Sequence, residues 1–382
     1  MKILFTGGGT GGHIFPIIAI IREIKKISPQ KDNIKPFTFY YLGANDKLRS
    51  AFLLKKEGVK VKIILSGKIR RYLTPLALFW NLIDIFFKIP LGILQAFFYL
   101  FFLAPDVIFS KGGYGSLPVV LSGWLLQIPI FLHESDIAPG LVNKFLGRFA
   151  VEIFVSFPNT EGFPSEKIFV VGNPIRQGIL EGSLEEAKKI FQLTGEKPLI
   201  LIMGGSQGAQ RINDLVLNIL PEWVEHFELI HITGPQNYEE VKKEAEVVLR
   251  PELRKYYHPV GFLEEELLKH AYCASHFIVS RAGAGSIFEI AALAKPSILI
   301  PLPEAAQNHQ LKNAYAFAQA GATIVIEQAN LTPHFLLERI RYLFAHPKEF
   351  QKIAQGAGKF ARPRAAKIIA EYLVTYLTGS LL

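Results

Sequence analysis

The sequence predicts an α/β protein of two domains, each a parallel sheet flanked by helices. At 382 residues the chain is too long for one ordinary core and fits two domains. Half of its residues are hydrophobic and 20% are charged, which indicates large buried cores and argues against disorder. Short β-rich runs alternate with helical stretches almost throughout, which is the pattern of parallel sheets with helical crossovers.

Each half of the chain supplies its own strands. In the first half we expect strands at 2–6, 38–42, 61–65, 107–110, 128–133 and 153–156. The first helix is expected from about 14 to 27. In the second half we expect strands at 199–203, 228–232, 258–260, 277–280, 297–300 and 323–326.

The stretch 157–183 is rich in proline, glycine and polar residues, which is typical of a domain boundary. We therefore expect a first domain at 1–160 and a second at 161–360. The remainder, 361–382, is helical after an interruption at Pro363 and could lie across either domain.

Composition limits the class of function. The single cysteine, Cys273, excludes an intrachain disulfide, favours a reducing compartment and makes a metal site unexpected. The run 1–5 is short and meets glycines at once, so it is expected to be a buried strand and no secretory signal. A net charge of +9 favours anionic partners, but no nucleic-acid-binding motif is present, so nucleic acid is not expected.

The segment 73–103 is unusually apolar. Its aromatic residues are Phe79, Trp80, Phe86, Phe87, Phe97, Phe98, Tyr99, Phe101 and Phe102, with Lys68, Arg70, Arg71 and Lys88 as cations beside it. A spanning helix needs roughly 20 apolar residues. The run 91–103 is shorter, and Asn81 and Asp84 interrupt the part before Pro90, so we expect no spanning helix. A buried helix pair and an interfacial membrane patch both remain open.

Three glycine-rich turns follow predicted strands. The first, 7–12, precedes His13, and its exposed N–H groups at a helix start would attract an anion. Gly7, Gly9 and Gly12 satisfy G-x-G-x-x-G, but the second strand ends Tyr41-Leu42-Gly43 without the acidic residue that a dinucleotide site needs. A GK[ST] sequence is also absent, so neither a dinucleotide site nor a Walker loop is favoured.

The second turn, 204–209, repeats this arrangement in the second half of the chain. The third runs through 280–289, where Ser286 and Glu289 form S-x-x-E. This spacing predicts a capping box that starts a helix without any ligand. A carboxylate on the first helical turn would alternatively grip the vicinal hydroxyls of a ribose, and both interpretations remain open.

Taken together, these motifs resemble one family. The sequences at 8–13 (GGTGGH), 133–134 (HE), 172–176 (GNPIR), 204–208 and 310–314 (QLKNA) occur in the order found in the MurG family. These are the UDP-N-acetylglucosamine–lipid I N-acetylglucosaminyltransferases of peptidoglycan synthesis, and the likeness runs from residue 3 to about 322. It implies a GT-B fold, with two Rossmann-like domains facing across a cleft and the final helix returning to the first.

The resemblance also implies a reaction and its partners. An inverting enzyme would move N-acetylglucosamine from UDP-GlcNAc to the C4 hydroxyl of undecaprenyl-pyrophosphoryl-MurNAc-pentapeptide (lipid I), giving lipid II without a cofactor. It would work as a peripheral protein on the anionic cytoplasmic face of the plasma membrane. Three alternatives remain open: a glycolipid transferase of the same fold, a UDP-GlcNAc 2-epimerase, and a nucleotide-binding module without activity.

Site residues follow from the same resemblance. It assigns to the donor UDP-GlcNAc the residues Thr10, Gly11, Gly12, Asp136, Arg176, Ser206, Leu263, Ala284, Gly285, Ser286, Ile287, Phe288, Glu289 and Gln310. Gly112, Gly113, Tyr114 and Ser116 match the acceptor segment. This chain has Ser135-Asp136 where the family usually has Gln-Asn, and an ionised Asp136 cannot donate a hydrogen bond.

For catalysis, His13 is the first candidate base and Glu134 the second, although a histidine at a helix start is often only a structural cap. D-x-D, the usual metal-holding motif of glycosyltransferases, does not occur in the chain. Helix N-termini with Arg176 or Arg281 are therefore expected to stabilise the diphosphate.

Overall fold

The computed structural model describes residues 1–8, 11–27, 36–44, 48–68, 70, 74–205 and 209–379. The chain divides into two compact units, one of residues 1–176 with 364–382 and the other of residues 177–363. The sequence analysis expects the boundaries at 160 and 360. The first lies later because the strand after residue 160, and the turn that follows it, belong to the first sheet.

The first unit contains a seven-stranded sheet with the order β3-β2-β1-β4-β5-β6-β7, and all its pairings are parallel. The strands are β1 (Lys2–Thr6), β2 (Thr38–Gly43), β3 (Lys60–Ile63), β4 (Val107–Ser110), β5 (Ile130–Glu134), β6 (Glu152–Val155) and β7 (Ile168–Val170). Six were expected. The seventh, β7, was missed because it is a three-residue edge strand inside the segment interpreted as a linker.

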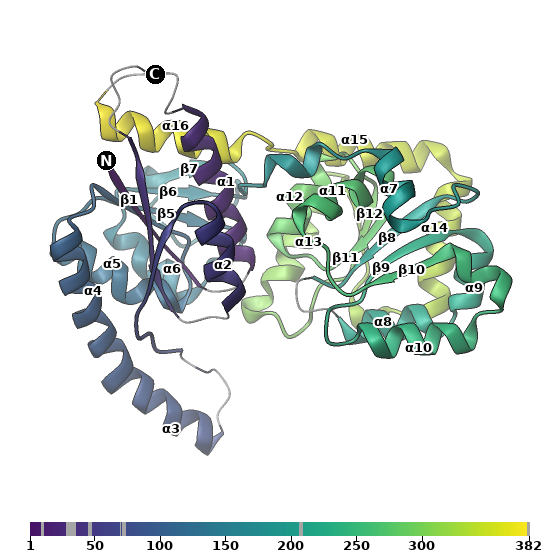
Figure 1. Cartoon of the computed structure of the whole chain (residues 1–382), viewed down its shortest axis with the longest axis horizontal. Helices are drawn as coiled ribbons and strands as arrows, with labels where there is room; N and C mark the ends of the chain where they lie inside the picture. Colours follow the sequence, from purple (N-terminus) through teal and green to yellow (C-terminus); the bar gives the residue numbers. More distant parts are fainter. Residues whose placement is uncertain are drawn as a thin grey trace. The chain divides into compact units, whose positions relative to one another are not determined.

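Helices cover both faces of this sheet (Figure 1). They are α1 (Gly11–Ile27), α2 (Leu48–Lys56), α5 (Leu117–Leu125), α6 (Leu141–Leu146) and α16 (Ala365–Thr378). One face packs against α1 and α16, where Ile369, Ala370 and Leu373 are fully buried. The Tyr372 hydroxyl donates a hydrogen bond to Glu152 in β6 at 2.9 Å. The final helix thus returns to the first unit, as the GT-B resemblance implies.

A long apolar helix runs along the other face and extends beyond it (Figure 1). It consists of α3 (Pro75–Ile83), a π-helical turn η2 (Asp84–Lys88) and α4 (Ile89–Leu103). Together these form 29 continuous residues, long and apolar enough to cross a membrane. An 18-residue window of this helix has a mean hydropathy of 1.8, and only 17% of that window is buried. Asn81 and Asp84, which were expected to break the apolar run before Pro90, lie inside this continuous helix, as does Pro90.

The polar residues are tolerated because they have partners outside and inside the helix. Asp84 accepts a hydrogen bond from Arg70, outside the helix, at 2.8 Å and forms an ion pair with Lys88, one turn further along the helix, at 2.6 Å. Burial alone would raise the pKa of Asp84, but hydrogen bonds from Lys88 and Arg70 hold that pKa below its usual value. Asn81 exchanges two hydrogen bonds with the backbone of Arg70. The π-turn, which closes with Ile89 N–H donating to the Asp84 carbonyl, absorbs the missing N–H of Pro90.

The second unit contains a six-stranded parallel sheet with the order β10-β9-β8-β11-β12-β13. Its strands are β8 (Leu199–Met203), β9 (Glu228–Ile232), β10 (Tyr257–Val260), β11 (Phe277–Ser280), β12 (Ser297–Leu299) and β13 (Ile324–Val325). Its helices are α7 (Leu184–Phe191), α8 (Gln210–Leu217), α9 (Leu220–His226), α10 (Tyr238–Val248), α11 (Glu265–Ala274), α12 (Ala284–Ala292), α13 (His309–Gln319), α14 (Pro333–Ala345) and α15 (Pro347–Phe360). All six strands were expected, with small differences at their ends.

Candidate active site

The strand order reverses once in each sheet, between β1 and β4 in the first unit and between β8 and β11 in the second. Ligands of open α/β sheets bind at the carboxyl ends of the strands beside such a switch point. The glycine-bearing turns of this chain follow those four strands, at 7–12, 112–113, 204–208 and 283–285. The topology therefore brings the sequence motifs of each unit to one edge of its sheet.

His13 lies in the first turn of α1, and its ring lies against the glycine turn that follows β4. A Cβ atom on Gly113 would lie 3.1 Å from His13 Nε2, and one on Gly8 would lie 3.1 Å from Nδ1. The two turns are also joined directly, since Gly8 N–H donates to the Gly112 carbonyl at 2.9 Å. Glycine at these positions lets the imidazole sit against both backbones. The structure thus unites the first candidate base with the acceptor residues Gly112 and Gly113.

The acceptor segment is a compact turn. Gly112 and Gly113 have φ of +81° and +82°, which favours glycine, and Tyr114–Ser116 form a short 3-10 turn before α5. Ser116 is buried, and its hydroxyl donates to the Gly113 carbonyl at 2.7 Å. That hydroxyl is therefore committed to closing the turn. Tyr114 is half-buried, and Lys68 Nζ lies 5.9 Å from the centre of its ring.

Glu134, the second candidate base, is buried at the end of β5 with both carboxylate oxygens in hydrogen bonds. One oxygen accepts from Asp136 N–H at 3.0 Å, and the other from Asn143 Nδ2 at 2.8 Å and Gly140 N–H at 3.3 Å. Burial, with the nearby charge of Asp136, raises the pKa of Glu134 to about 7. Because these donors come from the following loop and from α6, the carboxylate fixes the loop against that helix.

Lys111 is a buried cation that the sequence analysis did not single out. Its Nζ lies 2.8 Å from His133 Nδ1 and also donates to Ser135 Oγ. His133 Nε2 lies 3.1 Å from the Gly172 carbonyl, which fixes Nε2 as the donor and Nδ1 as the acceptor for Lys111. Burial and the Lys111 charge hold the pKa of His133 well below its usual value, so the imidazole is neutral. The sequence feature that could have identified Lys111 is its place between a buried strand and a pair of glycines.

The third glycine turn is built differently from the expected capping box. α12 begins at Ala284 with Gly283 as its N-cap residue, and no side chain caps it. Ser286 is the third helical residue and Glu289 the sixth, so neither the capping box nor a carboxylate on the first turn is present. Both interpretations placed the N-cap at Ser286, and this placement was wrong because the helix starts three residues earlier, with Gly283 as its N-cap residue. Glu289 Oε2 instead accepts from the Tyr272 hydroxyl at 3.0 Å.

The start of α12 is open to a ligand. A Cβ atom on Gly283 or Gly285 would meet nothing within 4 Å. In contrast, the side chains of Ala284, Ile287 and Phe288 are buried in the unit, so these expected donor residues would offer only backbone groups. An exposed helix N-terminus with bare backbone suits a diphosphate.

The remaining expected donor residues divide into two groups. Arg176 belongs to the first unit, where its guanidinium carbon lies 4.0 Å from the Phe15 ring centre, and that ring lies against Gly11 in the first turn of α1. Gly12 is exposed in the same turn. In the second unit, Leu263 is buried and Gln310 accepts from Leu302 N–H at 3.0 Å. Thr10 and Ser206 lie outside the described residues.

Arg281 does not have the role expected of it. Its guanidinium donates to the carbonyls of Ile300 and Pro301, both at 3.2 Å, and to Gln328 Oε1 at 2.8 Å. It is buried, and these bonds join β11 to the ends of neighbouring segments. The guanidinium is therefore used inside the protein, which leaves Arg176 as the stronger of the two candidates for the diphosphate.

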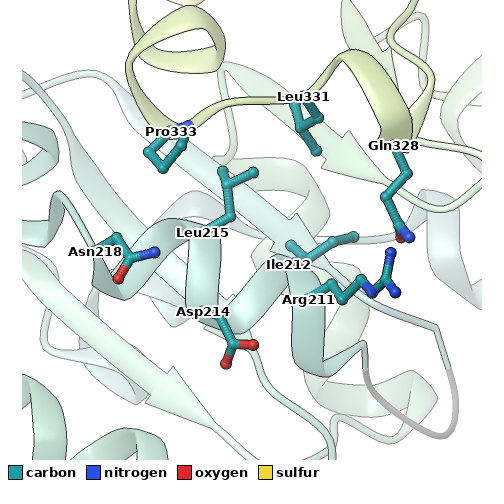
Figure 2. Close-up of a pocket in the computed structure, with 8 residues that line it drawn as sticks. All are labelled: Arg211, Ile212, Asp214, Leu215, Asn218, Gln328, Leu331 and Pro333. Carbon is teal, nitrogen blue, oxygen red and sulfur yellow. The ribbon is translucent and has the colours of Figure 1, made fainter.

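A pocket of about 300 Å³ lies in the second unit. Figure 2 shows the residues that line it: Arg211, Ile212, Asp214, Leu215, Asn218, Gln328, Leu331 and Pro333. None of the residues expected in the donor or acceptor site lines it. Its walls come mainly from α8 and the segment before α14.

Comparison with known proteins supports the assignment of these motifs. The N-terminal domain model of glycosyltransferase family 28 matches residues 3–155, and the C-terminal domain model of that family matches residues 199–369. The UDP-N-acetylglucosamine–N-acetylmuramyl-(pentapeptide) pyrophosphoryl-undecaprenol N-acetylglucosamine transferase of Clostridium tetani is 35% identical over 353 residues, covering 92% of each chain. Transferase 2 of that name from Bacillus thuringiensis is 37% identical over 355 residues, covering 92% of this chain and 94% of the relative.

Solved structures agree in fold. MurG of Acinetobacter baumannii matches with a TM-score of 0.71 and 25% identity, covering 98% of this chain and 99% of that one. The UDP-GlcNAc 2-epimerase of Neisseria meningitidis matches with a TM-score of 0.67 at 18% identity, covering 98% and 100%. At that identity the epimerase shares the fold alone.

Proposed function

The chain belongs to the MurG family within glycosyltransferase family 28, and we propose that His13 receives the acceptor proton in its reaction. The enzyme transfers N-acetylglucosamine from UDP-GlcNAc to lipid I and forms lipid II. The C4 hydroxyl of the acceptor attacks the anomeric carbon opposite UDP. The bond from that carbon to the UDP oxygen breaks, the new glycosidic bond forms with inversion, and the hydroxyl proton passes to His13.

The position of His13 is the observation that carries this assignment. Its ring lies against the Gly112–Gly113 turn, which is the segment expected to hold the acceptor. A base must lie within hydrogen-bond reach of the hydroxyl that it deprotonates. Glu134 is less suited because Asp136, Gly140 and Asn143 already donate to its oxygens.

The donor binds the second unit in this proposal. The diphosphate would lie at the open start of α12, where Gly283 and Gly285 leave space beside the backbone N–H groups. Glu289 would hold the ribose hydroxyls and Gln310 the sugar hydroxyls. Because the chain has no D-x-D sequence, helix dipoles and Arg176 would stabilise the departing UDP in place of a metal.

The long helix would dock the enzyme on the membrane that carries its acceptor. Its most exposed large side chains are Phe102 (80%), Leu76 (67%), Phe86 (66%) and Phe87 (63%). The neighbouring α5 and α6 add Trp124, Leu125 and Leu141, each more than half exposed. An exposed apolar surface of this extent marks a membrane or protein interface. Lys68 and Lys88 beside it would favour the anionic inner leaflet.

Assaying UDP release with and without a lipid I analogue tests the transferase. Release should depend on the acceptor, whereas release without acceptor would favour an epimerase and binding without turnover would favour a module without activity. His13→Ala should lower the rate about 10²–10⁴-fold while UDP affinity stays close to that of the wild type. If His13→Ala keeps the wild-type rate and Glu134→Gln loses it, the base is Glu134.

Vesicle co-sedimentation tests docking. Replacing Arg70 or Lys88 would disturb the buried Asp84, so the cleaner variant is Phe86→Ser with Phe102→Ser. Burying a phenylalanine contributes about 1.5–3 kcal/mol, so this variant should lower partitioning onto anionic vesicles at least tenfold. Val247→Ser, at an 84% exposed residue of the second unit, is the matched control and should bind as the wild type does. Equal binding of both variants would refute docking through this helix.

A further inference from the structure

We infer that Lys111 is a positioning residue for the transfer, joining the turn beside His13 to the segments that follow β5 and β7 and balancing the charges of Glu134 and Asp136. The inference rests on the proposed role of His13. It concerns a cation that contacts neither substrate in the proposed mechanism but holds together the three segments that frame the reacting groups.

The contacts of Lys111 connect three strand ends. Lys111 itself follows β4, and its Nζ contacts His133 at the end of β5 at 2.8 Å and Ser135 just beyond it. Through these partners it reaches the turn after β7, because His133 Nε2 donates to the Gly172 carbonyl and Ser135 Oγ donates to Asn173 Oδ1 at 2.9 Å. One buried ammonium thus unites segments far apart in the sequence.

The same residue is tied to the turn that carries His13. Lys111 N–H donates to the Thr6 carbonyl at the end of β1 at 2.8 Å, and the next residue, Gly112, accepts from Gly8. A Cβ atom on Gly7 would lie 3.3 Å from the Lys111 Cβ, so the two turns are packed closely. A movement of Lys111 would therefore shift the backbone against which the His13 ring lies.

Charge gives a second reason for a cation at this position. Lys111 is 2% exposed and lies within the electrostatic reach of Glu134 and Asp136. Burial lowers the pKa of Lys111 to about 8, while attraction to the two carboxylates opposes that change. Above the pKa of Glu134, about 7, one cation facing two carboxylates leaves a single negative charge. Removal of the cation would place two carboxylates at the edge of the acceptor turn without a counter-charge and would raise the pKa of Glu134 further, because the Lys111 charge lowers it.

Stability alone does not account for this arrangement. A buried charge is often replaceable by a well-packed apolar side chain with no loss of stability, so a buried ion network is weak evidence for a stabilising role. The position of the network, directly between the acceptor turn and the loop that holds Asp136, indicates that it maintains the geometry of the site. A misplacement of about 1 Å at such a site lowers turnover on the order of 10²-fold.

The deciding variants are Lys111→Met and the double variant Lys111→Met with Asp136→Asn, which restores the wild-type balance of one excess negative charge. Lys295→Met is the control, because Lys295 is a half-buried lysine of the second unit that donates to the carbonyls of Cys273 and Ser275 at 3.0 and 2.7 Å. Folding is checked by circular dichroism, UDP affinity by calorimetry, and kcat with a lipid I analogue.

We expect Lys111→Met to remain folded, to bind UDP as the wild type does, and to lose kcat on the order of 10²-fold. The double variant should recover at least tenfold of that loss, and Lys295→Met should keep its kcat. A kcat within threefold of the wild type for Lys111→Met, or no recovery in the double variant, would overturn the inference. If Lys111→Met is insoluble, the double variant decides: soluble and active supports the inference, and anything else rejects it.

All rates are compared with the wild-type chain measured in the same assay. A wild-type chain that transfers nothing to the lipid I analogue would contradict the proposed function itself. A normal wild-type rate, with His13→Ala impaired and Lys111→Met unimpaired, would leave the proposed function standing and remove the role of Lys111.

Discussion

Replacing Gly112 by alanine should destabilise the first unit through Asn143. At Gly112 φ is +81°, and an added Cβ would fall inside 3.0 Å of the Asn143 side-chain amide. Asn143 is buried, and its Nδ2 donates to Glu134 at 2.8 Å. The substitution therefore adds backbone strain and forces the amide away from the carboxylate that it satisfies.

The structure provides the magnitude and the control. A left-handed conformation costs a residue with a Cβ roughly 1–2 kcal/mol. Losing a hydrogen bond to a charged group costs about 1.5–3 kcal/mol more. The free energy of unfolding should thus fall by about 2.5–5 kcal/mol in Gly112→Ala. Gly58 has φ of +71° with nothing within 4 Å of an added Cβ, so Gly58→Ala should show the strain alone.

Thermal unfolding followed by tryptophan fluorescence measures this difference. With Trp223 of the second unit changed to phenylalanine in every sample, the remaining tryptophans, Trp80 and Trp124, report on the first unit. For a domain of this size 1 kcal/mol corresponds to about 2–4 °C, so Gly112→Ala should melt about 5–20 °C lower and Gly58→Ala about 2–8 °C lower. In an Asn143→Ala background the cost of Gly112→Ala should shrink to that of Gly58→Ala. Equal costs for the two glycines in the wild-type background would refute the reasoning.

Three further predictions concern pH, metal and the donor site. Because burial raises the pKa of Glu134 to about 7, the folded first unit binds more protons than the unfolded chain between about pH 4.5 and 7. The free energy of unfolding of this unit should therefore fall by up to about 3 kcal/mol as pH rises through that range. The same decrease with pH in Glu134→Gln would contradict this prediction. The transfer rate should be unchanged by EDTA, since the chain has no D-x-D sequence. A rate that EDTA abolishes and that only Mn²⁺ or Mg²⁺ restores would contradict this prediction. Glu289→Ala should weaken the binding of UDP-GlcNAc. It should lower the free energy of unfolding by only about 1 kcal/mol, because it removes the hydrogen bond from Tyr272. A variant that is strongly destabilised but keeps its UDP-GlcNAc affinity would count against a donor role of Glu289.

The sheets were predictable because their central strands are continuous apolar runs that end at glycine turns. Ile3, Leu4 and Phe5 of β1 are fully buried, as are Ile200, Leu201 and Ile202 of β8. Strands buried on both faces have this pattern. In contrast, β7 contributes three residues, of which Phe169 and Val170 are 42% and 40% exposed, and such an edge strand resembles a loop in sequence.

The site residues were predictable where the backbone conformation requires a particular residue type. They were unpredictable where the role of a side chain depends on partners that are distant in the sequence. Gly112 and Gly113 stand out in the sequence because their turn requires glycine. The prediction of a capping box was wrong because the start of α12 depends on the surroundings of Gly283, which the local spacing of residues does not reveal. Arg281 and Lys111 have their roles through carbonyls, a histidine and carboxylates that lie far away along the chain. The helix continues through Asp84 for a similar reason, since Arg70 pairs with Asp84 from outside the helix.

The position of α16 determines the order in which the chain can fold during synthesis. Residues 177–363 form a contiguous unit inside the first, so all of its strands are available before the last helix is made. The first unit must wait, because Ala366, Ile369 and Leu373 complete the core over α1 and Tyr372 packs its ring on Phe154. Until α16 leaves the ribosome, α1 covers that face without its partner helix, although the strands of the sheet were translated earliest. The first unit is therefore completed last, and only chains that include α16 carry it complete.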